Sequence, residues 1–171
     1  MAGLDPKIAS LKKKEAVSAR GNMAIQVGST IQLNPKTEHC YVCGPRNENG
    51  LQVPFVVDEG GGSRGVYIAR AEHCGWPGLV HGGVAFALMD EALAWALYFQ
   101  GLFGVTARAE THFRRPVRAG TQLIIRAWML DRRRRLVNAH AEMRVDAEGG
   151  LLVAETDAVM YLQDIDAIRN D

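Results

Sequence analysis

The chain has 171 residues, and its 20 basic and 19 acidic side chains give a formal charge of +1. This length can bury a sizeable core in a single domain, and 47% apolar and 23% charged residues are ordinary values for a globular protein. The near-neutral balance excludes a wholly basic nucleic-acid binder and an acidic disordered protein, and no run approaches the roughly 20 apolar residues of a membrane helix.

The first 36 residues are polar and contain all five lysines of the chain. They predict an N-terminal appendage over residues 1–36, either a short helix or a disordered segment, followed by one domain over residues 37–171. The N-terminus lacks the apolar stretch of a secretory signal, and three cysteines do not make a disulfide framework. We therefore expect a cytoplasmic protein.

The domain begins with turn-forming residues over 37–50 and continues with two strand-like runs, at 51–58 and 63–71. The sequence Glu-Gly-Gly-Gly between the two runs is typical of a hairpin. A Gly/Pro-rich loop then leads toward the next element. This part of the chain predicts a β-hairpin.

A single strong helix is predicted over residues 81–100. In the run Val84–Phe99, 14 of 16 residues are apolar, and the two exceptions, Asp90 and Glu91, are adjacent. A helix that is apolar nearly all round is buried on most of its faces. We expect this helix to form the centre of the domain.

The rest of the chain favours strands, because apolar and β-branched residues partly alternate with polar ones. The four predicted strands span residues 105–117, 121–130, 136–145 and 151–162. Short connections between them favour an antiparallel meander. The sequence thus predicts an α+β fold, in which a curled antiparallel sheet of about five to six strands wraps around one long central helix.

The start of this helix, His81-Gly82-Gly83, has the composition of an electrophile-binding turn. The first N–H groups of a helix have no intrahelical partner and lie at the positive end of its dipole. Glycines there let a ligand oxygen approach the backbone, where a carbonyl becomes polarised. Asp90, two turns further along an apolar helix, is costly to bury and must be paired or used.

The run Gly78–Ala92 resembles the signature of the hotdog-fold acyl-CoA thioesterases, in their PaaI-like branch, where an Asp or Glu follows the His of an HGG motif by nine residues. A stretch of the form CxxCG…NxxGL matches at Cys40, Cys43, Gly44, Asn47, Gly50 and Leu51. A later strand with a threonine and an aromatic-basic-Arg-Pro ending matches at Thr106 and Phe113–Pro116. The resemblance covers about residues 38–162.

This resemblance implies a hotdog fold and hydrolysis of an acyl- or aryl-CoA thioester to the free acid and CoA. It implies that the Gly82 N–H polarises the carbonyl, and that Asp90 acts as the general base or the nucleophile. It further implies that Thr106 helps to place the water, that His81 shapes the loop and that Gly83 contacts substrate. In such enzymes the site lies between two chains, so a homodimer, or a dimer of dimers, is expected.

Clustered arginines suggest a phosphate contact for the CoA moiety. Between Arg108 and Arg135 there are nine arginines and two acids, a local balance of 9 − 2 = +7. Planar guanidinium groups bind two phosphate oxygens at once, although solvated outward positions explain such a cluster equally well. We expect Arg114 or Arg115 to hold the phosphates, and only one of them, because strand alternation sends them to opposite faces.

Three further features have plainer interpretations. Glu91 lies about 100° around the helix from Asp90, and we expect it to be paired or interfacial rather than catalytic. Four arginines, Arg132–Arg135, form the predicted tip between the strands at 121–130 and 136–145, and they fit a solvated turn better than a nucleic-acid patch. By residue type a zinc site could be composed of His39, Cys40, Cys43, His73 and Cys74, but a turn with two small buried cysteines explains the first pair as well. No metal and no separate cofactor are expected, since CoA is part of the substrate.

Two other functions remain open. A hotdog protein can bind an acyl-CoA without hydrolysing it, as a sensor or regulator, and hotdog dehydratases act on similar thioesters. In this chain the His precedes the glycines and the acid follows, which fits hydrolysis better than dehydration. One departure from several relatives is Gly75, where they place an Asn six residues before the His. The residues leave open the acyl group and whether a carrier protein replaces CoA.

Overall fold

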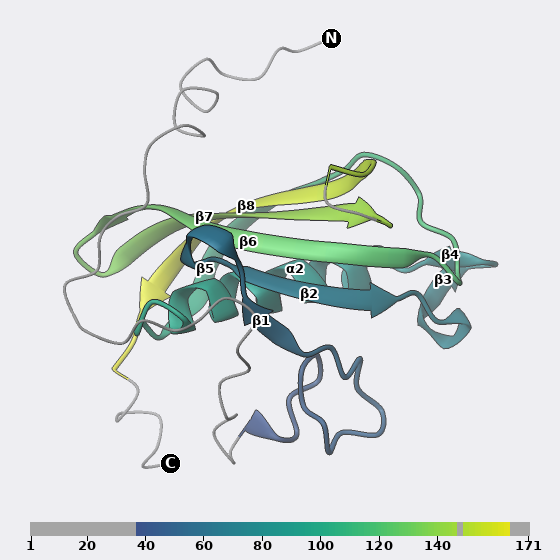
Figure 1. Ribbon diagram of the computed structural model, residues 1–171, viewed down its shortest axis with the longest axis horizontal. Coiled ribbons are helices and arrows are strands. Elements are labelled where there is room, and N and C mark those ends of the chain that lie inside the picture. Colours follow the sequence, from purple (N-terminus) through teal and green to yellow (C-terminus); the bar gives the residue numbers. More distant parts are fainter. Residues whose placement is uncertain (1–36, 147–148, 165–171) are drawn as a thin grey trace, which may run out of the picture.

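The computed structural model describes residues 37–146 and 149–164 (Figure 1). It has one long helix packed against a six-stranded antiparallel sheet, which confirms the predicted α+β hotdog architecture. The predicted N-terminal appendage, residues 1–36, lies outside the described residues. Among the helices that the structure describes, none is long and apolar enough to cross a membrane.

The main sheet has the strand order β1-β2-β6-β7-β8-β5, with every neighbouring pair antiparallel. Its strands are β1 (Phe55–Val57), β2 (Ser63–Ile68), β5 (Gly104–Phe113), β6 (Gln122–Arg133), β7 (Leu136–Val145) and β8 (Leu152–Leu162). A small ribbon of β3 (Cys74–Trp76) and β4 (Leu79–Val80) leads into the helix α2 (Gly82–Tyr98). Short 3-10 turns lie at Glu59–Gly61 and Ala71–His73.

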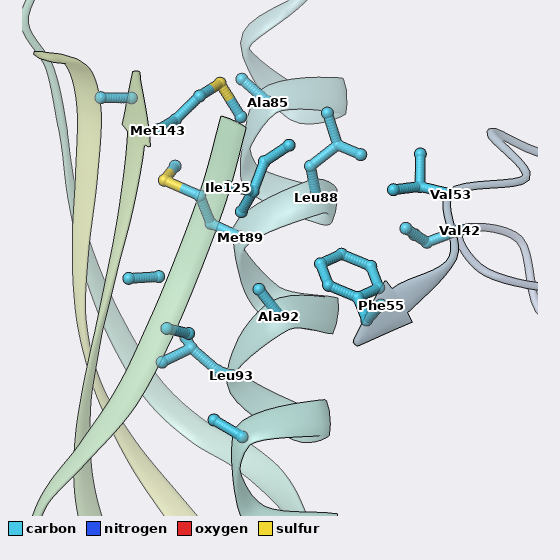
Figure 2. Packing of buried hydrophobic residues seen from close by; sticks show 14 of the residues in the cluster. Val42, Val53, Phe55, Ala85, Leu88, Met89, Ala92, Leu93, Ile125 and Met143 are labelled. Carbon is cyan, nitrogen blue, oxygen red and sulfur yellow. The ribbon is translucent and has the colours of Figure 1, made fainter. Parts of the chain in front are cut away.

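The helix α2 lies across the concave side of the sheet, with its buried residues repeating at helical spacing. These residues are Ala85, Leu88, Met89, Ala92, Leu93, Ala96 and Leu97. Ile125 and Met143 from the sheet pack against one side of them, and Val53 and Phe55 approach from the other (Figure 2). No residue from Val84 to Tyr98 is exposed, so the prediction that the helix is buried on most faces is confirmed.

Several strand ends differ from the sequence prediction. β1 covers only Phe55–Val57 of the run predicted at 51–58, and β2 ends at Ile68 rather than at 71. β5 ends at Phe113 rather than at 117, because the Arg114 and Arg115 N–H groups both donate to the Val153 carbonyl, an irregularity that ends the ladder. β6 continues to Arg133, and only Arg134 and Arg135 form the tight turn into β7, with Arg134 at a φ of 54°. The predicted four-arginine tip is therefore wrong, because long exposed side chains do not prevent the ladder from extending to its last two residues.

Candidate active site

The first turn of α2 presents one free backbone donor. His81 is the N-cap, and its Nδ1 accepts a hydrogen bond from the Gly83 N–H at 2.9 Å, a role usually taken by Ser, Asp or Asn. The next two N–H groups, of Val84 and Ala85, donate to the His81 carbonyl. Within the described part of the chain the Gly82 N–H has no acceptor. It can therefore donate to a ligand oxygen at the positive end of the helix.

Gly75 makes room for the capping histidine. A Cβ at this position would lie 2.7 Å from Cδ2 of His81, so an asparagine here would displace the imidazole ring. His73 does not replace the missing side chain, because its Nδ1 and Nε2 lie 2.5 Å from the Tyr67 hydroxyl and 3.2 Å from Arg70. Its contribution is its carbonyl, which accepts from the His81 N–H at 2.9 Å.

A pocket of about 260 Å³ opens beside Gly82. Its walls are mainly apolar and come from the start of α2, the segment after β5, and the inner faces of β6, β7 and β8. The Phe113 ring forms the part nearest the helix, 3.5 Å from where a Cβ on Gly82 would lie. Arg114 and Arg115 also line this pocket, so the structure brings both predicted phosphate ligands to the Gly82 end of the helix.

Strand alternation predicted that the two arginines lie on opposite faces, but both line the same pocket. Both of their backbone N–H groups donate to the Val153 carbonyl, an irregularity at the end of the ladder that breaks the alternation. They differ in their side chains instead. Arg114 is engaged with Glu155, through Nε at 3.0 Å and Nη2 at 2.5 Å. Arg115 is exposed, and its guanidinium has no partner among the residues described.

The candidate catalytic carboxylate contacts the predicted threonine. Thr106, on β5, donates its hydroxyl to Oδ1 of Asp90 at 2.5 Å, and the same hydroxyl lies 3.3 Å from Sδ of Met160. Asp90 is half-buried between α2 and this strand. Its other oxygen, Oδ2, has no hydrogen-bond partner in the described structure. That oxygen is thus available to water or to a reacting carbonyl.

The free N–H and the carboxylate lie too far apart to act on one carbonyl within a single chain. Eight residues separate Gly82 from Asp90 along α2, which corresponds to about 12 Å of helix axis. A donor and a carboxylate that act on one C=O group lie within roughly 7 Å of each other for direct attack, or within about 10 Å when a water stands between the carboxylate and the carbon. We call the Gly82 and Asp90 regions, one at each end of this helical segment, the two half-sites.

Glu91 points away from Asp90. Nε1 of Trp95 donates to its Oε1 at 3.0 Å, and the Cys40 thiol lies 3.6 Å from its Oε2. Burial raises the pKa of Glu91 to about 7. The carboxylate is therefore held by hydrogen bonds rather than by a cation of the described residues, and its closeness to a cysteine is a contact that sequence reasoning did not predict.

A second polar cluster that sequence reasoning missed surrounds His140, on the face of the sheet opposite to α2. Its Nδ1 lies 2.7 Å from Asp157, and its Nε2 lies 3.7 Å from Glu142 and 3.8 Å from Glu155. Burial lowers the pKa of His140, but the bonds with Glu142 and Asp157 outweigh burial and raise it. The His140 bond in turn lowers the pKa of Glu142 to about 2. The cluster is a buried network of titratable groups, and Glu155 connects it to Arg114 at the pocket beside Gly82.

Comparison with known proteins agrees with this geometry. Residues 77–152, which include both half-sites, match the family model of the thioesterase superfamily. No curated protein matches the chain in sequence.

Solved structures share the fold. A thioesterase superfamily protein named RHA08564 has a TM-score of 0.68 and 25% identity, covering 74% of this chain but only 61% of its own. A mutant of the phenylacetic acid degradation protein PaaI from Thermus thermophilus has a TM-score of 0.58 and 27% identity, and the match covers 65% of this chain and 93% of that protein. A hypothetical thioesterase from Streptococcus pneumoniae TIGR4, solved with coenzyme A, has a TM-score of 0.57 and 18% identity, and the match covers 60% of this chain and 82% of that protein. The domain therefore has the hotdog fold, and its residues 77–152 match the thioesterase superfamily, which supports the predicted resemblance to PaaI-like proteins.

Proposed function

We propose that the protein is an acyl-CoA thioesterase, which hydrolyses an acyl- or aryl-CoA ester to the free acid and CoA. The observation that carries this proposal is the hydrogen bond between Thr106 on β5 and Asp90 on α2, a helix whose first N–H is free beside a pocket. The Streptococcus pneumoniae thioesterase supports it, since that protein was solved with coenzyme A. It was also solved with alanine in place of an aspartate and of a threonine 16 residues apart, the same separation as Asp90 and Thr106.

In the proposed reaction the Gly82 N–H donates to the thioester oxygen and draws electron density from the carbonyl carbon. Asp90 then either removes a proton from an attacking water or attacks the carbon itself, forming a mixed anhydride that water hydrolyses. The hydroxyl of Thr106 holds Oδ1 of Asp90, which leaves Oδ2 directed to the water or the carbon. The C–S bond breaks, and CoA leaves as the thiol after taking a proton.

A panel of acyl- and aryl-CoA esters with detection of the released thiol tests this proposal. Steady release from at least one ester supports hydrolysis, and the preferred ester identifies the acyl group. Saturable binding of CoA esters without thiol release would contradict hydrolysis and would indicate a sensor or regulator.

The three cysteines are all free, which supports a cytoplasmic location, where thiols stay reduced.

We propose that the site is completed by a second copy of the chain, in a homodimer or a dimer of dimers. β5 is the end strand of the sheet, and it exposes Val105 and Phe113. An unpaired edge with apolar side chains invites pairing with another strand. If two β5 strands pair about a two-fold axis, the Gly82 end of one helix lies opposite the Asp90 region of the other.

Light scattering on an active sample is expected to give at least a dimer mass at micromolar concentration. The reason is that neither half-site suffices alone, since about 12 Å of helix separates them. A monomer mass in a sample that still hydrolyses its substrate would contradict the two-chain site.

Arg115→Ala is expected to raise KM for the CoA ester by roughly 3–30-fold and to weaken its dependence on salt, with little change in kcat. The physical reason is that Arg115 has a free guanidinium at the pocket, whereas that of Arg114 is engaged with Glu155. Arg114→Ala is the matched variant, and it is expected mainly to lower thermal stability, because the buried Glu155 carboxylate loses its arginine partner and keeps only the longer contact with His140. Unchanged KM values in both variants would show that neither arginine holds the phosphates.

A further inference from the structure

Three metal-ligating side chains from two distant segments meet beside α2, and the proposed reaction uses none of them. They are Cys40 and Cys43, from the turn before β1, and Glu91 from the helix. One sulfur or oxygen atom from each lies within 4.8 Å of the other two, and Sγ of Cys40 is 3.6 Å from Oε2 of Glu91. Cys43 is 5% exposed, and Cys40 and Glu91 are half-buried, so the cluster lies at the edge of the core.

The backbone of the turn is arranged around the Cys40 sulfur. The Val42 N–H donates to Sγ of Cys40 at 3.4 Å, and the Gly44 N–H closes the turn on the Cys40 carbonyl at 3.0 Å. Glycine is required at 44, because a Cβ there would collide with the Cys40 backbone. The turn therefore fixes the Cys40 sulfur in a position that faces Glu91.

Glu91 completes the set, with one oxygen fixed and the other directed to the sulfurs. The Trp95 indole holds Oε1, so Oε2 faces Cys40. No arginine, lysine or histidine of the described residues pairs with this carboxylate. Two thiols and a buried acid without a cation are costly to ionise, and a bound cation removes that cost. The cluster therefore matches a cation rather than another side chain.

We propose that Cys40, Cys43 and Glu91 bind a zinc ion, with water in the fourth position. Zinc takes tetrahedral sets of thiolate and carboxylate ligands, whereas Mg²⁺ and Ca²⁺ prefer oxygen alone. A CxxC pair in a reducing compartment is also more often a metal or catalytic site than a structural disulfide. The ion fastens the turn to α2 at Glu91, the residue that follows Asp90.

This site differs from the zinc set considered from the sequence. Cys74 is not part of it, because its Sγ lies 3.8 Å from the Arg70 carbonyl, and His73 is bonded to Tyr67. Glu91 supplies the third ligand in their place. A Cys40–Cys43 disulfide is the competing arrangement, but it requires an oxidant such as a peroxide and leaves Glu91 without a cation.

Titration of the reduced, chelator-treated full-length protein with ZnCl₂ or CoCl₂ tests the site. One equivalent is expected to bind, and Co²⁺ is expected to give a sulfur-to-metal charge-transfer band with the strong visible bands of tetrahedral coordination. Zinc should protect two of the three cysteines from alkylation until a chelator is added, and it should raise Tm. Failure of the reduced wild-type chain to bind one equivalent, or an alkylation pattern unchanged by zinc, would overturn the proposal.

Variants separate the ligands from their surroundings. Cys40→Ser and Cys43→Ser are each expected to weaken zinc binding by ~100-fold or more. Glu91→Gln is expected to weaken it by ~10–100-fold and to keep the sulfur-to-metal band, because both thiolates remain. Cys74→Ser is the matched control and should bind like the wild type. If Cys74→Ser weakens binding as much as Cys40→Ser, or if Cys40→Ser keeps the full cobalt spectrum, the assignment is wrong.

Discussion

Replacing Asp90 by asparagine is expected to lower turnover of the CoA ester by ~10²–10⁴-fold. Water attacks a thioester slowly unless a base removes its proton or a carboxylate attacks directly, and the amide of Asp90→Asn can do neither. The amide keeps the size of the side chain and can still contact Thr106. KM is therefore expected to stay within a few-fold of the wild-type value, because the pocket beside Gly82 is untouched. Steady-state kinetics with thiol detection measure both constants.

Glu91→Gln is the control one position along the helix. Its carboxylate faces Cys40 and Trp95 rather than Thr106, so we expect a loss of at most about tenfold in turnover. Light scattering first checks that both variants form the same oligomer as the wild type, so that a failure to assemble is not interpreted as a catalytic loss. Near-wild-type turnover in a folded Asp90→Asn dimer, or abolition of turnover by Glu91→Gln in a sample that keeps the wild-type Tm, would contradict the assignment.

The parts of the fold that depend on local pattern could be predicted from the sequence. The helix is found at Gly82–Tyr98 against a prediction of 81–100, because its apolar run is long and its start carries His-Gly-Gly. The ribbon of β3 and β4 was missed, since strands of three and two residues are too short to show alternation. The end of β5 was misplaced by a backbone irregularity at Arg114, which depends on where the Val153 carbonyl lies.

The candidate site, like the fold, could be predicted from the sequence only where it depends on local spacing. His81, Gly82, Gly83 and Asp90 lie on one helix, so their spacing alone fixes their separation. The resemblance implied only that Thr106 helps to place the water, and its bond with Asp90 was not predicted, because it joins a helix to a strand 16 residues later. The contact of Cys40 with Glu91 spans 51 residues and depends on how the first turn docks on α2, which no periodicity encodes. The register that places His140 opposite Asp157 is likewise a tertiary property.

Gly82→Pro is expected to lower turnover by ~10²–10³-fold, the usual cost of removing one oxyanion donor. Proline lacks the N–H that is free in the wild-type chain, and the first position of a helix tolerates it. His81 already has a φ of −64° and a ψ of 134°, the extended conformation that a residue before proline adopts. Gly82→Ala is the matched control, because it keeps the N–H and adds a methyl group in ordinary contact, 3.5 Å from Phe113. We expect it to retain turnover within about tenfold.

Mixing the two inactive variants decides whether the half-sites of two chains act together. A dimer with one Asp90→Asn chain and one Gly82→Pro chain has one site built from the intact Gly82 of the first and the intact Asp90 of the second. Its other site carries both substitutions. If equal amounts exchange subunits at random, half of the dimers are mixed and one of their two sites works, so about a quarter of the wild-type turnover should return. Recovery shows that catalysis crosses the interface, since neither variant alone holds a complete site. Subunit exchange without recovery would mean that Gly82 and Asp90 do not act on the same carbonyl across the interface, and the two-chain site would have to be abandoned.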